Sequence, residues 1–471
     1  MQGILKLPLF LRATALLFVF SDLAVVSLSV ILTVLVRYAF GGQFHPSLYW
    51  QLWPALGLFL LAFAALGLYP GALLSPPEEL KKTFWGTSLI FLALGSGTFL
   101  IQGGIFYSRS IFAVAWLLTV MLLPLSRALI RDRCGARPWW GYPAVVIGDA
   151  AVGGRLVRTL LRRRDLGLKP AVLVSEDARS DDPELAGVPV IGPARFREIA
   201  GRLACPYAVV AMPDGRRQDT ADLVETLGRH FQKIILVPDL MARSSLWVSA
   251  VDFGGILGLE LKQKLLDPGR LAMKRAMDLL LTLLAAVVVL PASLAIAVAI
   301  VLESPGPVLY RQRRIGFDGR EIRVFKFRTM VPDAERVLEE CLARNEALCR
   351  EWRESRKLKD DPRITRTGRW LRKYSLDELP QLLNVLQGEM SLVGPRPIVA
   401  DEVGRYGDLY TVYARVRPGL TGLWQISGRN DLTYEERVAL DAYYIRNWSV
   451  WLDIYILTRT LPVVLRGEGA Y

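Results

Sequence analysis

Two adjacent carboxylates, Asp377 and Glu378, stand in one of the local motifs of this sequence whose residue types could do chemistry. A carboxylate can act as a covalent nucleophile towards phosphoryl groups, and it is a natural ligand of a hard metal ion. The pair stands in the run Ser375-Leu-Asp377-Glu378-Leu-Pro380-Gln381, which we expect to open a helix. Ser375 or Asp377 would cap that helix, and a helix N-terminus also favours anions. Taken alone, the run favours capping over catalysis.

Basic residues in constrained backbone surroundings accompany this pair. Arg396 lies between Pro395 and Pro397, and such a rigid backbone indicates a positioned guanidinium. Arginine forks suit bidentate phosphate contacts, although a solvated basic face near anionic lipid headgroups would have the same composition. The stretches concerned are Lys326-Phe-Arg328-Thr-Met330, Gly394-Pro-Arg396-Pro397, Arg417-Pro-Gly-Leu-Thr421-Gly422, Gly428-Arg429-Asn430 and Asp441-Ala-Tyr-Tyr-Ile-Arg-Asn-Trp-Ser-Val-Trp-Leu-Asp453.

The scarce residue types exclude other chemistry. The two histidines are His45 and His230, so a Ser-His-Asp or Cys-His mechanism is excluded from the second half of the chain. The four cysteines include no C-x-x-C pair, which excludes a closely spaced structural zinc site and indicates reduced thiols. Catalysis must then rely on carboxylates, Arg and Lys, hydroxyls and a hard metal.

Composition indicates a membrane protein. The chain has 471 residues, of which 52% are hydrophobic and 22% charged, with a net charge of +13. That length predicts roughly two to four domains. The apolar content excludes intrinsic disorder, and without an RNA- or DNA-binding module we expect no nucleic-acid partner. High hydrophobicity with high basicity suits work at an anionic leaflet.

The first quarter of the chain predicts a membrane-embedded bundle. Its apolar runs have close to the ~20 residues needed to cross a bilayer. A cleaved signal peptide would have a shorter apolar region, and three more spans would not follow it. Asp22 lies near one end of the first span, where a functional and a packing role are equally open. The expected spans are 13–36, 50–69, 84–102 and 107–125.

Basic residues determine the expected orientation of this bundle. Lys6 and Arg12 precede the first span, and Arg127 and Arg131 follow the fourth. Four spans return the chain to its starting side, so the N-terminus and everything after residue 126 are expected on the cytoplasmic side.

Residues 140–260 have the composition of a soluble α/β domain. Their strands and helices alternate, which predicts a parallel, doubly wound sheet. The loop Gly148-Asp-Ala-Ala-Val-Gly153-Gly154 is like a dinucleotide-binding turn, but Ala150 replaces its second glycine. We favour a degenerate Rossmann-like domain used for regulation or dimerisation over one that binds a nucleotide. The expected strands are 144–147, 171–174, 188–191, 207–211 and 233–237, the helices 194–203 and 219–230, and the candidate ribose contacts Glu176 and Asp177.

A second hydrophobic segment, 276–302, is almost wholly apolar, with Asp278 as its charge. A fifth transmembrane helix is the simple interpretation. However, Pro291 lies in its middle and would kink it, and basic residues flank both ends, whereas a crossing segment should be basic on one side. We therefore expect a re-entrant helix over 274–303, broken at Pro291, that returns to the cytoplasmic side.

The ordered set of C-terminal stretches resembles the monotopic phosphoglycosyl transferases, also called bacterial sugar transferases. The resemblance covers residues 268–471 and rests on the runs K-F-R-T-M, S-L-D-E-L-P-Q, V-G-P-R-P, R-P-G-L-T-G and G-R-N. It implies an α+β monotopic catalytic domain over 268–471 with a re-entrant membrane helix. In front of it would stand an α-helical membrane bundle over 1–135 and a Rossmann-like α/β domain over 140–260. It also implies the bacterial inner membrane, with the middle and catalytic domains on the cytoplasmic side, and it allows a homodimer.

What the family does supplies the expected reaction. Its members transfer a sugar-1-phosphate from a UDP-sugar to undecaprenyl phosphate and release UMP, the first membrane step of O-antigen, capsule or exopolysaccharide synthesis. The resemblance implies galactose-1-phosphate, with glucose-1-phosphate as the alternative. A catalytically inert membrane scaffold is the alternative of a different class, which intact Asp377, Glu378 and Arg396 disfavour.

The resemblance also implies roles for single residues. Asp377 would be the nucleophile that forms an aspartyl-phosphosugar, and Mg²⁺ held by Asp377 and Glu378 would neutralise the diphosphate. Family members often have Ser-Pro at the hairpin break, where this chain has Leu290-Pro291. Arg396 is the expected phosphate contact, and Lys326 and Arg328 are expected in the same electropositive, substrate-binding pocket. The expected nucleotide or sugar contacts are Arg417, Arg429 and Asp441.

Overall fold

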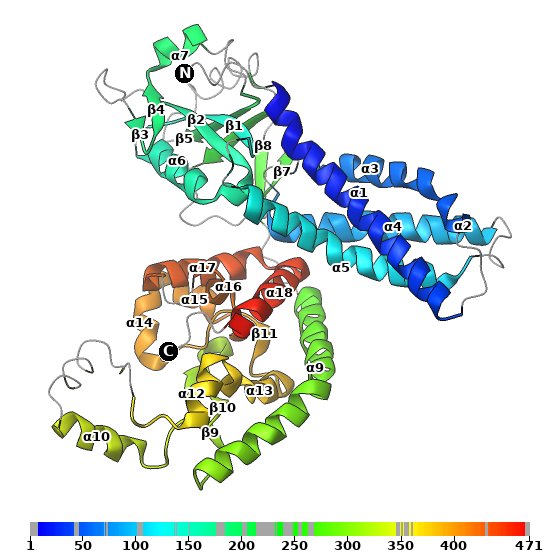
Figure 1. The fold of residues 1–471 in the computed structure, drawn as a ribbon. Coiled ribbons are helices and arrows are strands. Elements are labelled where there is room, and N and C mark those ends of the chain that lie inside the picture. The colour runs from blue at the N-terminus through cyan, green and yellow to red at the C-terminus, as the bar shows by residue number, and fades with distance from the viewer. Residues whose placement is uncertain are drawn as a thin grey trace. The chain divides into compact units, whose positions relative to one another are not determined.

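The computed structural model divides the chain into two compact units, Met1–Ser244 and Ser245–Tyr471. The bundle and the α/β sheet share the first unit (Figure 1). The hairpin of β7 (Val248–Asp252) and β8 (Leu257–Leu261) belongs to the second. The residues that the structure describes are 8–41, 47–69, 71, 74–100, 107–135, 137, 139–149, 151–175, 184–199, 205–212, 231, 233–238, 248–252, 257–261, 268–344, 349, 352, 358, 361–428 and 432–466.

The bundle consists of long helices α1 (Pro8–Ala39), α4 (Pro76–Leu100) and α5 (Arg109–Cys134) with the shorter α3 (Leu56–Ala65). Two segments of it, Ala13–Ala39 and Arg109–Cys134, are long and apolar enough to cross a membrane. The expected second span over 50–69 is divided, because α2 (Ser47–Trp50) and a 3₁₀ turn (Trp53–Ala55) precede α3. Apolar side chains from these helices, including Phe59, Phe63 and Leu123, form the bundle core.

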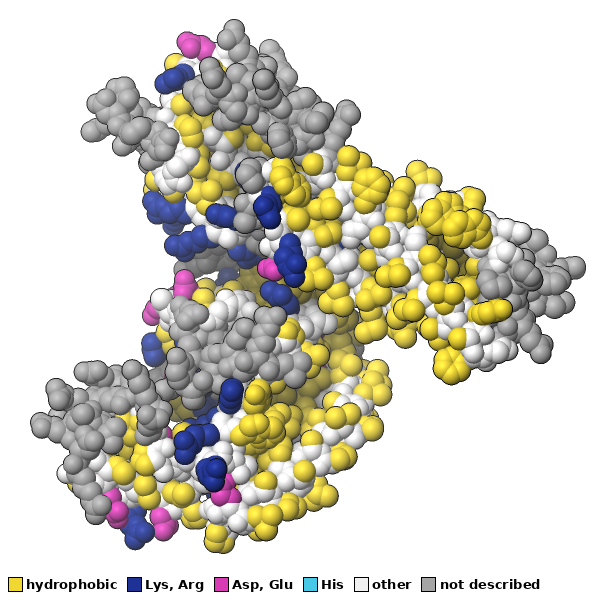
Figure 2. Space-filling model, viewed as in Figure 1, with side chains coloured by type: hydrophobic (Ala, Val, Ile, Leu, Met, Phe, Trp, Pro, Cys, Tyr) yellow, Lys and Arg dark blue, Asp and Glu magenta, His cyan; other side chains and the backbone are white. Residues whose placement is uncertain are grey.

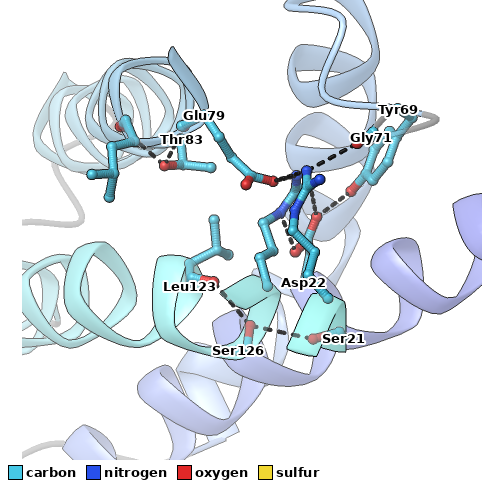
Figure 3. A network of polar contacts seen from close by, with 11 residues as sticks. Ser21, Asp22, Tyr69, Gly71, Glu79, Thr83, Leu123 and Ser126 are labelled. Atoms are coloured by element: carbon cyan, nitrogen blue, oxygen red, sulfur yellow. Dashed lines mark hydrogen bonds and ion pairs between the residues drawn. The ribbon is translucent and has the colours of Figure 1, made fainter. Parts of the chain in front are cut away.

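A buried ion network joins α1, α4 and α5 at one end of the bundle (Figure 3). The guanidinium of Arg127 is fully buried; its Nε donates to Asp22 Oδ1 over 2.9 Å and its Nη1 to Glu79 Oε1 over 2.8 Å. Tyr69 donates its hydroxyl to Asp22 Oδ2 over 2.7 Å, and Arg131 donates to Glu79 Oε1 over 3.1 Å. Of the two roles left open for Asp22, these contacts match helix packing.

A parallel sheet follows the bundle. Its strand order is β3-β4-β2-β1-β5-β6, and each neighbouring pair is parallel except β3–β4. The expected strands are confirmed, and α6 (Val152–Arg162) begins in the glycine loop. The elements are β1 (Tyr142–Ile147), β2 (Leu168–Val174), β3 (Glu184–Leu185), β4 (Val188–Ile191), α7 (Pro193–Ile199), β5 (Tyr207–Met212) and β6 (Lys233–Pro238).

Close packing and capping explain the glycine loop. A Cβ on Gly148 would lie 3.0 Å from Ala211 Cβ, so the loop needs glycine there for contact with β5. The Asp149 carboxylate accepts a hydrogen bond from the Val152 amide over 2.5 Å and so occupies the start of α6, where a Rossmann-type domain would bind a phosphate. The candidate ribose contacts Glu176 and Asp177 and the expected helix 219–230 lie outside the described residues.

The second unit contains an antiparallel hairpin of β9 (Leu309–Ile315) and β10 (Glu321–Phe327) and a parallel pair of β11 (Ser391–Val393) and β12 (Gly419–Thr421). One apolar core, with Val324, Met390, Val393, Tyr444 and Trp448 among its members, packs these strands against the helices. The helices are α10 (Ala334–Arg344), α12 (Arg366–Lys373), α13 (Gln381–Gln387), α14 (Val403–Tyr406), α15 (Tyr410–Tyr413), α16 (Leu423–Ile426), α17 (Tyr434–Asn447) and α18 (Val450–Arg466).

Helix α9 (Pro268–Glu303) is also long and apolar enough to cross a membrane. Large apolar side chains along it are exposed, from Leu280 to Leu302, and Figure 2 shows hydrophobic side chains along its surface. The expected break at Pro291 is absent, because helical structure continues through this residue. A proline removes one backbone hydrogen bond and bends a helix without having to end it, and Figure 1 shows α9 curving along the second unit.

Both ends of α9 are bound to the second unit. Near its start, Lys274 Nζ donates to the Val393 carbonyl over 2.9 Å and to Asp453 Oδ2 over 2.8 Å. Near its end, Ile300 packs in a cluster with Phe327 of β10 and Leu371 of α12. The middle of α9 presents its apolar side chains outwards between these two attachments.

Candidate active site

Asp377 and Glu378 lie in a separate 3₁₀ turn, Leu376–Glu378, between α12 and α13. Ser375, at the entry to this turn, has a left-handed backbone (φ 53°), and its side chain makes no capping hydrogen bond. Helix α13 begins later, after Pro380, also without a side-chain cap. The expectation that Ser375 or Asp377 caps a helix is therefore wrong. The pair is held by a strained turn, a feature that functional sites often carry.

Lys326 of β10 faces both carboxylates. Its Nζ lies 2.6 Å from Glu378 Oε1 and 3.9 Å from Asp377 Oδ2. Burial raises the pKa of Asp377 to about 6; Lys326 and Arg372 oppose that rise, and Glu378 adds to it. At neutral pH this carboxylate is ionised yet more basic than an ordinary aspartate, which suits a nucleophile.

The pair opens into a cleft with a volume of about 1520 Å³. Pockets that hold one small ligand measure roughly 300–1,000 Å³, so this cleft has room for more than one. Its walls come from α10, β9, β10, α12, α16, α17 and α18. The basic residues that line it are Lys326, Arg328, Arg336, Arg363, Arg372, Arg396 and Arg437.

Two motifs that are far apart in the sequence meet to position Arg396. The amide of Gly419 donates to the Pro395 carbonyl over 2.8 Å, next to the pairing of β11 with β12. A Cβ on Gly394 would lie 2.7 Å from the Arg417 carbonyl oxygen, so only glycine permits this approach. Arg396 then reaches the cleft, with its Cζ 5.8 Å from the centroid of the Trp424 ring.

Two of the expected substrate contacts have structural partners instead. Arg328 lines the cleft, but its guanidinium donates to the carbonyls of Ser304 and Pro305 and so holds the end of α9. Arg417 is not among the cleft residues, and its Nε donates to the Gly388 carbonyl over 2.8 Å. This bond ties the turn after α13 to the segment before β12.

Asp441 also lies away from the cleft surface. Its side chain is buried, with Oδ2 accepting a hydrogen bond from the Tyr406 hydroxyl over 2.9 Å. Burial raises the pKa of Asp441 to about 8, and the Tyr406 hydroxyl and the backbone and charge of Arg396 counteract part of that rise. Asp441 is thus a buried partner of Tyr406 and not part of the cleft surface. Arg429 lies outside the described residues.

Four arginines of the cleft, Arg336, Arg363, Arg372 and Arg437, were not singled out from the sequence. Arg372 donates from Nε to Thr329 Oγ1 over 2.9 Å and lowers the pKa of Asp377. Arg437, on α17, lines the cleft beside Trp424. It lies four residues before Asp441 on the same helical face, but Asp441 is buried away from the cleft, so this spacing did not indicate it.

The described residues contain no group of three or more His, Cys, Asp or Glu that could hold a metal ion. This does not conflict with Mg²⁺, which is commonly bound by one or two carboxylates together with substrate phosphates. Asp377 and Glu378 have the donor atoms for such a site, although Lys326 contacts one oxygen of Glu378. The carboxylates would hold Mg²⁺ together with a bound diphosphate rather than alone.

Sequence comparison identifies the family. The family described as bacterial sugar transferase matches residues 269–467, which include α9 and the whole cleft. The chain is 35% identical over 368 residues to the UDP-galactose-lipid carrier transferase of Erwinia amylovora, covering 77% of this chain and 76% of the relative. The chain belongs to the bacterial sugar transferase family.

Other members of the family are similar over most of their length. The undecaprenyl-phosphate galactose phosphotransferase of Salmonella typhimurium is 33% identical over 78% of this chain and 77% of its own. The UDP-glucose:undecaprenyl-phosphate glucose-1-phosphate transferase of Escherichia coli is 33% identical over 82% of this chain and 81% of its own. Because these matches exceed the 269–467 region, the similarity extends into the first unit.

Proposed function

We propose that this sugar transferase moves a hexose-1-phosphate, galactose-1-phosphate in first place, from a UDP-sugar to undecaprenyl phosphate and releases UMP. The observation that carries the proposal is the Asp377–Glu378–Lys326 cluster, which opens into a basic cleft beside an exposed apolar helix. Both substrates would be phosphorylated, and one would be a lipid. The names of the relatives support this substrate pair.

The chemistry proceeds in two displacements. The carboxylate oxygen of Asp377 attacks the β-phosphorus of the UDP-sugar, the bond from that phosphorus to the bridging oxygen breaks, and UMP leaves with the electron pair. A phosphate oxygen of the lipid then attacks the aspartyl-phosphosugar, which releases Asp377 as a carboxylate. Such transfers need positioning and charge neutralisation, which Lys326, Arg372 and Arg396 can supply without a histidine. Mg²⁺ on Asp377 and Glu378 would neutralise the diphosphate.

We infer that α9 is re-entrant. If it crossed, its ends would lie on opposite sides of the bilayer, yet Lys274 near one end and Ile300 near the other contact the same unit. The exposed apolar middle of α9 would lie in the cytoplasmic leaflet. The accessibility of a cysteine introduced at position 320, compared with one at position 45, would test this. A crossing helix places both positions on the outer side of the membrane, whereas a re-entrant helix keeps position 320 on the cytoplasmic side.

The bundle then anchors the protein as a multi-pass protein of the inner membrane, with the cleft on the cytoplasmic side. From Asp22 to Ala39 in α1, and from Arg109 to Arg127 in α5, the helix rises about 26–27 Å, close to the ~30 Å of a hydrocarbon core. The ion network would therefore lie at the cytoplasmic interface. The parallel sheet would be a degenerate Rossmann-like domain, with Asp149 in place of a phosphate.

UMP release from a panel of UDP-sugars with undecaprenyl phosphate is the test of this function. UDP-galactose should give the fastest release, and faster release from UDP-glucose would favour the alternative donor. Asp377→Asn should abolish release, and wild-type protein given labelled UDP-galactose without lipid should retain label in the sugar-phosphate moiety. Absence of UMP release from every donor would instead favour the inert scaffold.

A further inference from the structure

Two arginines lie against one aromatic ring in the cleft. The Cζ of Arg437 is 5.0 Å, and the Cζ of Arg396 is 5.8 Å, from the centroid of the Trp424 ring. All three residues line the cleft. Arg396 comes from the segment after β11, Trp424 from α16 and Arg437 from α17, so this cluster exists only in the folded chain.

Arg437 packs against Trp424, but its positive charge has no acidic partner among the described residues. Within the described part of the chain its Nε is buried and has no hydrogen-bond partner, and no salt bridge is found for its guanidinium. A guanidinium whose charge has no partner is costly to hold in the wall of the cleft, and a ligand anion bound by its terminal nitrogens would offset that cost.

The wall beside this cluster is apolar. Leu457, Thr460 and Val464 line the cleft from α18, and their spacing places them on one helical face. Leu420 of β12 lines the same cleft. The Asp453 carboxylate, earlier in α18, accepts a hydrogen bond from Lys274 of α9, so this helix is tied to the one with the exposed apolar surface.

We propose that Arg437 and Arg396, braced by Trp424, bind the phosphate of the polyprenyl acceptor, while its first isoprene units lie along the Leu457–Val464 face of α18. A nucleotide-sugar is polar apart from its uracil ring, and it has little use for an extended apolar helix face next to an anion site. An amphiphile with a phosphate head matches both features. The Lys326 side of the cleft, with Asp377, is left for the diphosphate of the donor. This assignment rests on the proposed function.

The test separates the two half-reactions. Arg437→Gln should leave the single-turnover release of UMP, measured with UDP-sugar alone, within about twofold of wild type. The KM for undecaprenyl phosphate in steady state should rise about 10- to 100-fold, as expected for loss of a charge-assisted hydrogen bond. Arg437→Lys should lie between the two, because a lysine keeps the charge but lacks the planar fork. Leu457→Asp should likewise raise the KM for the lipid and leave the single-turnover release of UMP (the burst) unchanged.

Arg415→Gln is the matched control, since Arg415 is exposed and is not among the cleft residues. It should change neither half-reaction. A lost burst with an unchanged KM for the lipid in Arg437→Gln would overturn the proposal and assign Arg437 to the donor. Unchanged kinetics in both half-reactions would overturn it as well. Thermal unfolding of each variant shows whether it is folded. If Arg437→Gln is misfolded, the KM of Arg437→Lys for the lipid decides whether Arg437 binds the acceptor. If the wild type releases no UMP from any donor, it is the proposed function that fails.

Discussion

Replacing Lys326 by Met should make Asp377, the proposed nucleophile, harder to ionise. Lys326 is the nearest cation to Asp377, and its charge favours the carboxylate form. It is also paired with Glu378, so its removal releases a second negative charge beside Asp377. Both effects raise the pKa of Asp377 above its value of about 6. Activity at acidic and neutral pH should therefore fall more than activity at alkaline pH.

The size of this effect follows from the 3.9 Å separation of Lys326 Nζ and Asp377 Oδ2. Two unit charges about 4 Å apart interact by about 1 kcal/mol in water and about 4 kcal/mol at an effective dielectric constant near 20. Each pKa unit corresponds to about 1.4 kcal/mol. The acid limb of the pH profile should thus move upward by about one to three pH units.

The assay is the second-order rate of UMP release in a single turnover, with donor below saturation and no lipid. This rate reports the ionisation of the free enzyme. Leaving out the lipid removes its phosphate, whose second pKa of about 6 would otherwise overlap with that of Asp377. In the wild type the rate should fall as pH drops through about 6, because Asp377 becomes protonated.

Glu378→Gln supplies the control of opposite sign. Glu378 raises the pKa of Asp377, so its neutral replacement should move the acid limb downward, whatever it does to the maximum rate. If Lys326→Met lowers the rate equally at all pH values, Lys326 acts on the substrate and not on Asp377. If the acid limbs of the pH profiles of Lys326→Met and Glu378→Gln move in the same direction, the electrostatic reasoning is refuted.

Two further predictions concern the framework. Arg127→Met should destabilise the bundle by about 3–5 kcal/mol, because it leaves the buried carboxylates of Asp22 and Glu79 without their cation; an unchanged Tm in detergent would contradict this. Gly394→Ala should lower the Tm and abolish UMP release, because the new Cβ would meet backbone atoms 2.7–2.8 Å away. Gly404→Ala, where a Cβ meets nothing within 4 Å, should leave both measurements close to wild type, and a similar loss in that variant would remove the packing argument.

The periodic and apolar parts of this protein were predictable from the sequence. The five strands around the glycine loop were confirmed because buried parallel strands are short apolar runs bounded by turns. The prediction of one continuous span over 50–69 was wrong, because its apolar run contains Pro54, beside which the helix is divided into short pieces. Likewise Pro291 marks a bend and not a break, since packing on both sides of it keeps α9 helical.

The site was predictable only in part. Asp377, Glu378, Lys326 and Arg396 meet in the cleft, as their chemistry suggested. Arg417 is an arginine in a motif similar to that of Arg396, but its guanidinium binds a backbone carbonyl instead. A motif shows that a residue is constrained; it does not show whether a ligand or the protein's own backbone constrains it.

The sequence by itself predicted the first and last apolar helices of the bundle, the apolar helix α9 and the strands of the parallel sheet, and it excluded histidine chemistry from the second half of the chain. Each of these depends on residue type or on local periodicity. Only the tertiary structure decided that Asp22 is paired with Arg127, that both ends of α9 contact one unit, and that Arg437 joins Arg396 at Trp424. These are contacts between residues far apart in the chain, and they form only when packing brings distant segments together.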